Sequence, residues 1–197
     1  MNYFIKLIIL LTIFLMACAP QNDKQLSLVL DCAQKNRQEL EKVLRHYNND
    51  PEKLAAARFL ILNMPYHYTL EQYYVSPLNE KFKPDIATFD SLQYAVNLLD
   101  SLKNEGYKME SSIKHDISTL DSRFLIDNID MAFAVWKKPW AINISFNDFC
   151  RYILPYRAQT EEVSNLRKEI MERFVPILDS ANVKTPLEAC AVLNEHL

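Results

Sequence analysis

The feature that most constrains this chain is its near lack of glycine, because Gly106 is the only glycine among 197 residues. At an average usage of about 7%, a chain of this length would carry roughly a dozen or more. Tight hairpin turns, β-bulges and phosphate-binding loops often need positive φ, which glycine adopts without steric cost. The sequence therefore argues against a β-sandwich, a Rossmann domain or a P-loop, and it predicts an all-α, irregular multi-helix fold.

Composition narrows the class of protein further. Hydrophobic residues make up 49% of the chain and charged residues 24%, which is typical of a globular protein. The net charge of −3 argues against a nucleic-acid partner. A chain of this length can bury enough apolar surface to fold without a metal or disulfides. The sequence has no H-E-x-x-H motif and no calcium loop, and we expect no metal and no cofactor.

Capping residues and apolar periodicity mark the expected helices. Asn36 and Glu39 have the spacing of a capping box, Asp50 with Pro51 begins a helix that ends near Asn63, and Gly106 is the expected end of another. The expected helices are 26–35, a helix after Asn36, 51–63, 88–105, 120–136, 145–153, 163–178 and one that begins at Thr185. Residues 66–85 are expected to be mostly loop, and 108–118 is a polar stretch.

The first residues resemble a bacterial lipoprotein signal. Lys6 precedes an apolar run from Leu7 to Ala17, which is too short to span a bilayer. The run ends in Leu-Met-Ala-Cys, which is similar to a lipobox and implies lipidation of Cys18. We expect residues 1–17 to be a signal peptide, 18–25 a lipidated tether at the outer membrane, and 26–197 a helical domain. Ordinary secretion and an uncleaved anchor are the alternatives.

Few residues suggest catalysis. Cys32, Cys150 and Cys190 are the other cysteines, and none has a histidine at metal-ligand or catalytic spacing on its own helix. We expect all three to be buried and apolar, although a pairing of Cys150 with a distant histidine stays open. The only dense aromatic stretch runs from Trp136 to Arg157. Most of it is expected in the core, and the candidates for an interface are Trp136, Trp140, Tyr152, Tyr156 and Arg157.

Two stretches, Gln38–Met64 and Phe124–Arg157, resemble the N-terminal region of bacterial surface lipoproteins that carry a transglutaminase-like domain. The resemblance implies a papain-like core downstream, whose pattern is a glycine-flanked cysteine followed by a histidine and an aspartate. That pattern is absent from this sequence, and Cys190 has no flanking glycine. The resemblance therefore predicts a non-catalytic helical module of a lipid-anchored envelope protein. The alternative is a self-standing lipoprotein that binds an envelope protein or a glycan, and an enzyme with another site is a third hypothesis.

Overall fold

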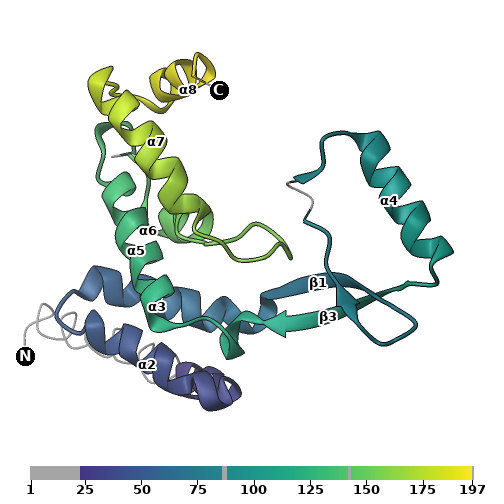
Figure 1. Cartoon of the computed structure of the whole chain (residues 1–197). Helices are drawn as coiled ribbons and strands as arrows, with labels where there is room; N and C mark the ends of the chain where they lie inside the picture. Colours follow the sequence, from purple (N-terminus) through teal and green to yellow (C-terminus); the bar gives the residue numbers. More distant parts are fainter. Residues whose placement is uncertain (1–22, 86–87, 142, 197) are drawn as a thin grey trace, which may run out of the picture.

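A computed structural model describes residues 23–85, 88–141 and 143–196, and it divides into two regions (Figure 1). The body is made of residues 23–67 and 116–196. The arm is made of the described residues of 68–115 and extends away from the body. In Figure 1 the long strands β1 and β3 run side by side out of the body, and helix α4 lies at the far end of the arm.

The body is built from helices. Residues 23–32 form the first helix, and the others are α2 (Arg37–His46), α3 (Pro51–Asn63), α5 (Ser122–Trp136), α6 (Phe146–Asp148), α7 (Leu166–Ser180) and α8 (Pro186–Asn194). Short 3-10 turns join them at Gln34–Asn36, Met64–Tyr66, Asp116–Ser118 and Pro139–Ala141. A single π-helical turn, η6 (Phe149–Ile153), follows α6.

The main core lies where α2, α3 and α5 pack together with η6. Leu40, Ala56, Ile129 and Phe149 are all 0% exposed. The ring of Phe149 stacks on Trp136 with centroids 4.4 Å apart. A smaller cluster of Leu178, Val183 and Ala189 joins α7 to α8. The body therefore derives its stability from apolar faces that neighbouring helices cover.

The arm contains an antiparallel sheet with strand order β2-β1-β3. Strand β1 is Tyr68–Val75, β2 is Lys81–Phe82 and β3 is Lys108–His115. The register between the long strands runs from Tyr68 opposite His115 to Val75 opposite Lys108. Helix α4 (Leu92–Asn104) belongs to the connection from β2 to β3.

The expectation of an all-α fold is wrong, because the structure is 62% helical and 11% strand and is therefore mixed. Residues 66–85 are not mostly loop, and the polar stretch 108–118 contains β3. The sheet forms without glycine for two reasons. The turn after β1 places Asn79 at φ 66°, and asparagine tolerates this region better than most residues. The connection from β1 to β3 includes α4 and needs no tight hairpin.

Most of the expected helix boundaries are close to the observed ones. Asp50 accepts a hydrogen bond from the Lys53 backbone N–H at 3.1 Å, as expected of an N-cap. Gly106 follows α4 with φ 82°, and Thr185 with Glu188 forms a complete capping box. These signals are local, so the sequence contains them in full.

The capping box expected at Asn36 and Glu39 is not formed. The Asn36 side chain instead donates hydrogen bonds to the carbonyls of Ile117 and Leu120, at 3.1 and 2.8 Å. Glu39 accepts from the backbone and hydroxyl of Ser122 at 3.0 and 2.6 Å. Both residues thus tie α2 to the start of α5, which is a contact between segments far apart in the sequence.

Candidate functional site

A groove on the body is the main candidate for a binding site. Its volume is about 910 Å³, within the range of roughly 300–1,000 Å³ that is typical of small-molecule sites. The lining residues come from α3, the residue before β1, α5, η6, the segment that follows it, and α7: Phe59, Asn63, His67, Val135, Arg151, Tyr152, Ile153, Pro155, Tyr156, Arg157, Ala158, Glu161, Leu166, Arg167, Ile170 and Met171.

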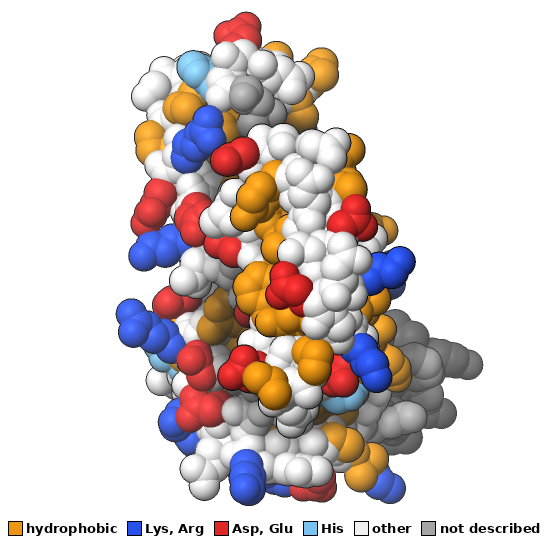
Figure 2. Space-filling view, turned by 45° about the vertical axis from the view of Figure 1, so that its right-hand side comes forward, with side chains coloured by type: hydrophobic (Ala, Val, Ile, Leu, Met, Phe, Trp, Pro, Cys, Tyr) orange, Lys and Arg blue, Asp and Glu red, His pale blue; other side chains and the backbone are white. Residues whose placement is uncertain are grey.

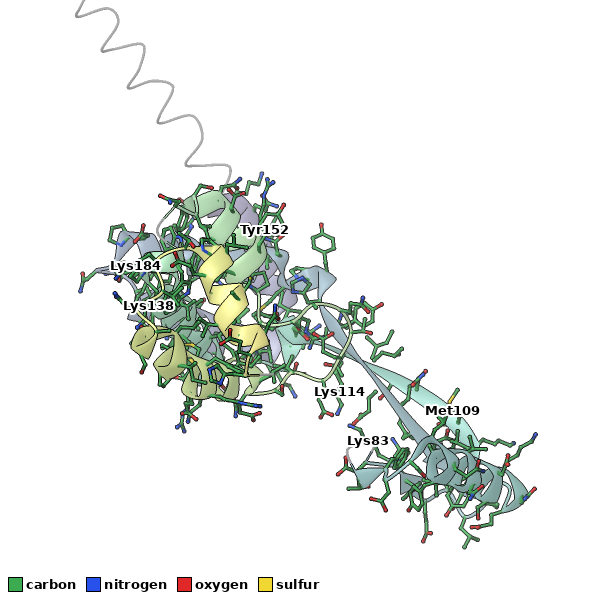
Figure 3. All side chains as sticks on the ribbon, turned by 90° about the horizontal axis from the view of Figure 1, so that it is seen from above. Lys83, Met109, Lys114, Lys138, Tyr152 and Lys184 are labelled. Carbon is green, nitrogen blue, oxygen red and sulfur yellow. The ribbon has the colours of Figure 1, made fainter. Side chains whose placement is uncertain are left out.

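The π-helical turn η6 positions the rim of the groove. Ser145 begins this segment by accepting a hydrogen bond from the Asp148 backbone N–H at 3.1 Å. Phe149 then anchors the turn in the core, while Tyr152 is 78% exposed. Figure 3 labels Tyr152 on the body, away from the arm. A π-turn changes the direction of side chains along a helix, and such turns are frequent at functional sites.

Arg157 joins the groove to the root of the arm. Its Nε lies 2.9 Å from the Asp116 carboxylate, and both side chains are almost completely buried, at 2% and 1% exposed. The guanidinium also donates to the Tyr68 carbonyl at 2.5 Å and to the Thr69 hydroxyl at 2.9 Å. One side chain therefore holds the start of β1 and the residue that follows β3. Arg157 is a structural joint that also lines the groove.

The buried Asp116 carboxylate has a second partner in Tyr156, whose hydroxyl donates to it at 2.9 Å. Burial raises the pKa of Asp116, and the Tyr156 hydrogen bond and the Arg157 charge oppose that rise. Burial also raises the pKa of Tyr156. Beside them, His67 Nδ1 is buried without a hydrogen-bond partner among the described residues.

Arg167 contributes the other notable charge. It lies in the first turn of α7 and donates to Asn128 Oδ1 at 2.7 Å and to the carbonyls of Ile153 and Pro155 at 2.6 and 2.7 Å. All of these acceptors are neutral. Burial lowers the pKa of the Arg167 guanidinium, and within the described residues no carboxylate forms an ion pair with it.

The five residues proposed from the sequence as an interface have different environments. Trp136 packs in the core, and its Nε1 donates to the Ile144 carbonyl at 2.9 Å. Trp140 packs against the cluster between α7 and α8. Tyr156 and Arg157 belong to the buried network described above. Tyr152 is exposed at the rim, so it is the member of the set that is most available to a partner.

Sequence reasoning missed Arg151, Arg167 and the wall of α7. The signal for that wall was present, because Leu166 and Ile170 recur at helical spacing within the expected helix 163–178. Both remain exposed, at 56% and 47%. The side of α7 that lines the groove could not be distinguished from a core face, since periodicity shows that a face is apolar and does not show what covers it.

The expectation of three buried cysteines is wrong for two of them. Cys32 and Cys190 are exposed, whereas Cys150 is buried. Burial raises the pKa of the Cys150 thiol to about 11, so it is almost entirely protonated near neutral pH. No cysteine lines the groove. Cys18, the expected lipidation site, lies outside the described residues.

Two features are absent from the part of the chain that the structure describes. None of the helices there is both long enough and apolar enough to cross a membrane. Within the same ranges no cluster of three or more histidine, cysteine, aspartate or glutamate side chains could hold a metal ion.

Comparisons of the chain with protein-family models, with curated proteins and with solved structures gave no match. The resemblance to lipoproteins with a transglutaminase-like domain therefore stays a prediction, and the groove is interpreted from its own residues.

Proposed function

We propose that this chain is the non-catalytic binding module of a lipid-anchored protein of the bacterial cell envelope, and that its ligand occupies the groove. The observation that carries the proposal is the groove itself. It combines an apolar lining with an exposed aromatic residue, Tyr152, and with guanidinium groups. Such a combination of apolar surface and a few charged groups is typical of ligand sites.

The anchor and the family belong to the same proposal. The apolar run that ends at Cys18 supports a lipid anchor, and the multiple acyl chains of a lipoprotein would give stable attachment to a bilayer. The resemblance over Gln38–Met64 and Phe124–Arg157 supports a module that accompanies a transglutaminase-like core. In that arrangement the groove would bind a ligand and the downstream core would supply any chemistry.

A self-standing lipoprotein that binds an envelope protein is the second candidate. The observation that favours it is the apolar surface of the arm, where Leu78 and Leu92 are 82% and 83% exposed. Exposed apolar patches often mark protein interaction sites. Figure 2 shows hydrophobic side chains exposed between charged and other surface on the face that comes forward in that view.

A photo-crosslinking amino acid in the groove tests whether a ligand or partner binds there more than at other exposed surface. We would place it at Tyr152 in the full chain, expressed in bacteria, with Leu187 as the control because Leu187 is 81% exposed and lies outside the groove. We expect a discrete cross-linked species from position 152 that position 187 does not give. Equal, diffuse labelling from both positions would contradict the groove as a binding site.

Lipidation and the absence of catalysis have separate tests. Metabolic labelling with palmitate should modify the chain, and Cys18→Ala should abolish that label.

The purified chain should not incorporate an amine into a glutamine donor. Turnover that Cys150→Ala removes would show instead that the chain is an enzyme.

A further inference from the structure

The charges that line the groove are unequal. Arg151, Arg157 and Arg167 contribute three guanidinium groups, whereas Glu161 contributes the only carboxylate of the lining. The Glu161 carboxylate accepts hydrogen bonds from the backbone N–H groups of Ala158 and Gln159 at 2.7 and 2.8 Å. These bonds hold the carboxylate in its own loop without removing its charge, so with Arg157 paired to Asp116 the groove retains an excess of one positive charge.

Two of these guanidinium groups are available to an anion. Arg157 is neutralised by Asp116. Arg167 has neutral acceptors for its Nε and Nη2 atoms, and no hydrogen bond is formed by its Nη1 within the described residues. Arg151 is exposed and has no ion-pair partner there. A partly buried cation without a counter-charge attracts an anion more strongly than a solvated cation does.

The remaining lining is largely apolar. Phe59, Val135, Ile153, Leu166 and Met171 line the groove together with Ile170. The α7 residues lie within one turn of Arg167, so the apolar wall and the cation are neighbours. The N-terminus of α7 adds the positive end of a helix dipole on the same side. A ligand that fits would have an apolar body and one anionic end.

We propose that the groove binds a fatty-acid-like amphiphile, with its acyl chain along the apolar wall of α7 and its carboxylate between Arg151 and Arg167. This inference rests on the proposed function of the groove as a binding site and adds the chemistry of the ligand. The volume of about 910 Å³ favours a small amphiphile over a folded partner domain.

The test uses membranes that contain the full chain and two photoactivatable probes of equal chain length. One is a diazirine-bearing palmitic acid and the other is the corresponding alcohol. Cross-linked peptides are located by mass spectrometry. We expect the acid to label the peptides of 151–158 and 166–171 at least about tenfold more than the alcohol, because a charge-assisted hydrogen bond has no equivalent in the alcohol. Unlabelled palmitate should compete.

Matched variants separate charge from shape. Arg151→Gln should lower labelling by the acid about two- to fivefold and lower labelling by the alcohol less, whereas the exposed Arg123→Gln should change neither. Ala158→Trp, which adds bulk at the rim, should lower labelling by both probes. Ala191→Trp, on exposed α8 surface, is its control.

The outcomes distinguish this inference from the proposed function. Equal labelling of the groove by acid and alcohol would overturn the anionic ligand and would keep the groove as an apolar binding site. Absence of groove labelling by both probes would overturn the amphiphile. If a discrete cross-link from position 152 persisted in that case, the groove would bind a ligand of another class, and if it were also absent, the proposed function would fail as well.

Discussion

The body and the arm contain similar kinds of apolar residue and differ in what covers them. In the body, Leu40, Ile129 and Phe149 are completely enclosed by neighbouring helices. Among the described residues of the arm only Ser76 and Leu102 are buried. Figure 3 shows the arm extending away from the body and labels Met109 of β3, which is 63% exposed. An amphipathic segment becomes part of a core only where another element reaches it.

This difference determines where the stability of the chain comes from. The body has contacts among helices that are distant in sequence, so it should unfold as a cooperative unit. Helix α4 depends more on local signals, which are the cap formed by Ser91 with the Tyr94 backbone N–H at 3.1 Å and the C-terminal Gly106. Regions with few buried apolar contacts open at a lower free energy than the core. The two regions therefore make separable predictions.

The largest effect is expected at the joint between the two regions. Arg157→Ala should lower the free energy of unfolding by about 3–5 kcal/mol, because it leaves the buried Asp116 carboxylate without its counter-ion. It also removes the hydrogen bonds to the start of β1. Urea unfolding measures the loss, and hydrogen exchange should show β1 losing protection first. Arg123→Ala, on exposed surface, is the control, and equal stability of the two variants would contradict the claim that Arg157 stabilises the connection between body and arm.

Core truncation tests the contrast directly. Ile129→Ala should cost about 2–5 kcal/mol, because Ile129 is 0% exposed and its loss leaves a cavity in the body. Leu92→Ala in α4 should change stability by less than about 0.5 kcal/mol, because Leu92 is 83% exposed. Chemical denaturation of both variants measures the difference. A large cost for Leu92→Ala would mean that the arm is covered in solution, which would break the comparison.

A smaller effect is expected within the arm. Gly106 has φ 82°, and a Cβ there would lie 3.2 Å from Pro77 Cγ. Gly106→Ala should therefore cost about 1–2 kcal/mol, since L-residues are strained at this φ. Gly106→Asn should cost less than alanine, because asparagine tolerates the left-handed region better. Thermal unfolding with exchange mapped by mass spectrometry should place the effect in α4 and β3. An effect spread through the body would show that the two regions unfold together.

Gly106 also shows how far the sequence could predict the fold. Its role at the end of α4 was predictable because a cap depends on a few adjacent residues. The inference that a chain with one glycine lacks a sheet failed, since it assumed glycine-dependent hairpins. Strand β3 is polar on both faces except at Met109 and Ile113, so it lacks the alternation that marks a half-buried strand. Its pairing with β1 joins two strands that are far apart in the sequence, with α4 in the segment between them.

The groove was less predictable than the fold. Tyr152 was identified from the aromatic stretch, and so were Tyr156 and Arg157. Arg167 was missed because its role depends on the neutral carbonyls of Ile153 and Pro155, which it meets only once α7 has packed against that segment. The spacing of residues in the sequence does not show which charged side chain will lack a counter-ion in the folded protein.

The smallest expected effect is a pH dependence within the body at Glu39. Hydrogen bonds from Lys42 and from Ser122 lower the pKa of Glu39 to about 2, below its ordinary value of 4.5. Because the folded pKa is the lower one, the charged carboxylate stabilises the fold above pH 4.5, and this contribution is lost as the pH falls toward 2. Glu39→Gln should remove that part of the acid sensitivity, while its amide oxygen can still accept a hydrogen bond from the Ser122 hydroxyl.

The measurement is the urea midpoint as a function of pH for the wild type and for Glu39→Gln, with Glu52→Gln as the control. Glu52 is an exposed acid in the first turn of α3, so its replacement should leave the dependence near that of the wild type. Because Glu39 ties α2 to Ser122 at the start of α5, the effect belongs to the body. The contrast of the two regions therefore predicts that hydrogen exchange in α4 is the same in Glu39→Gln and in the wild type at neutral pH. Faster exchange in α4 would show that the anchoring of α2 to α5 is transmitted into the arm, and the two regions would then be one cooperative unit.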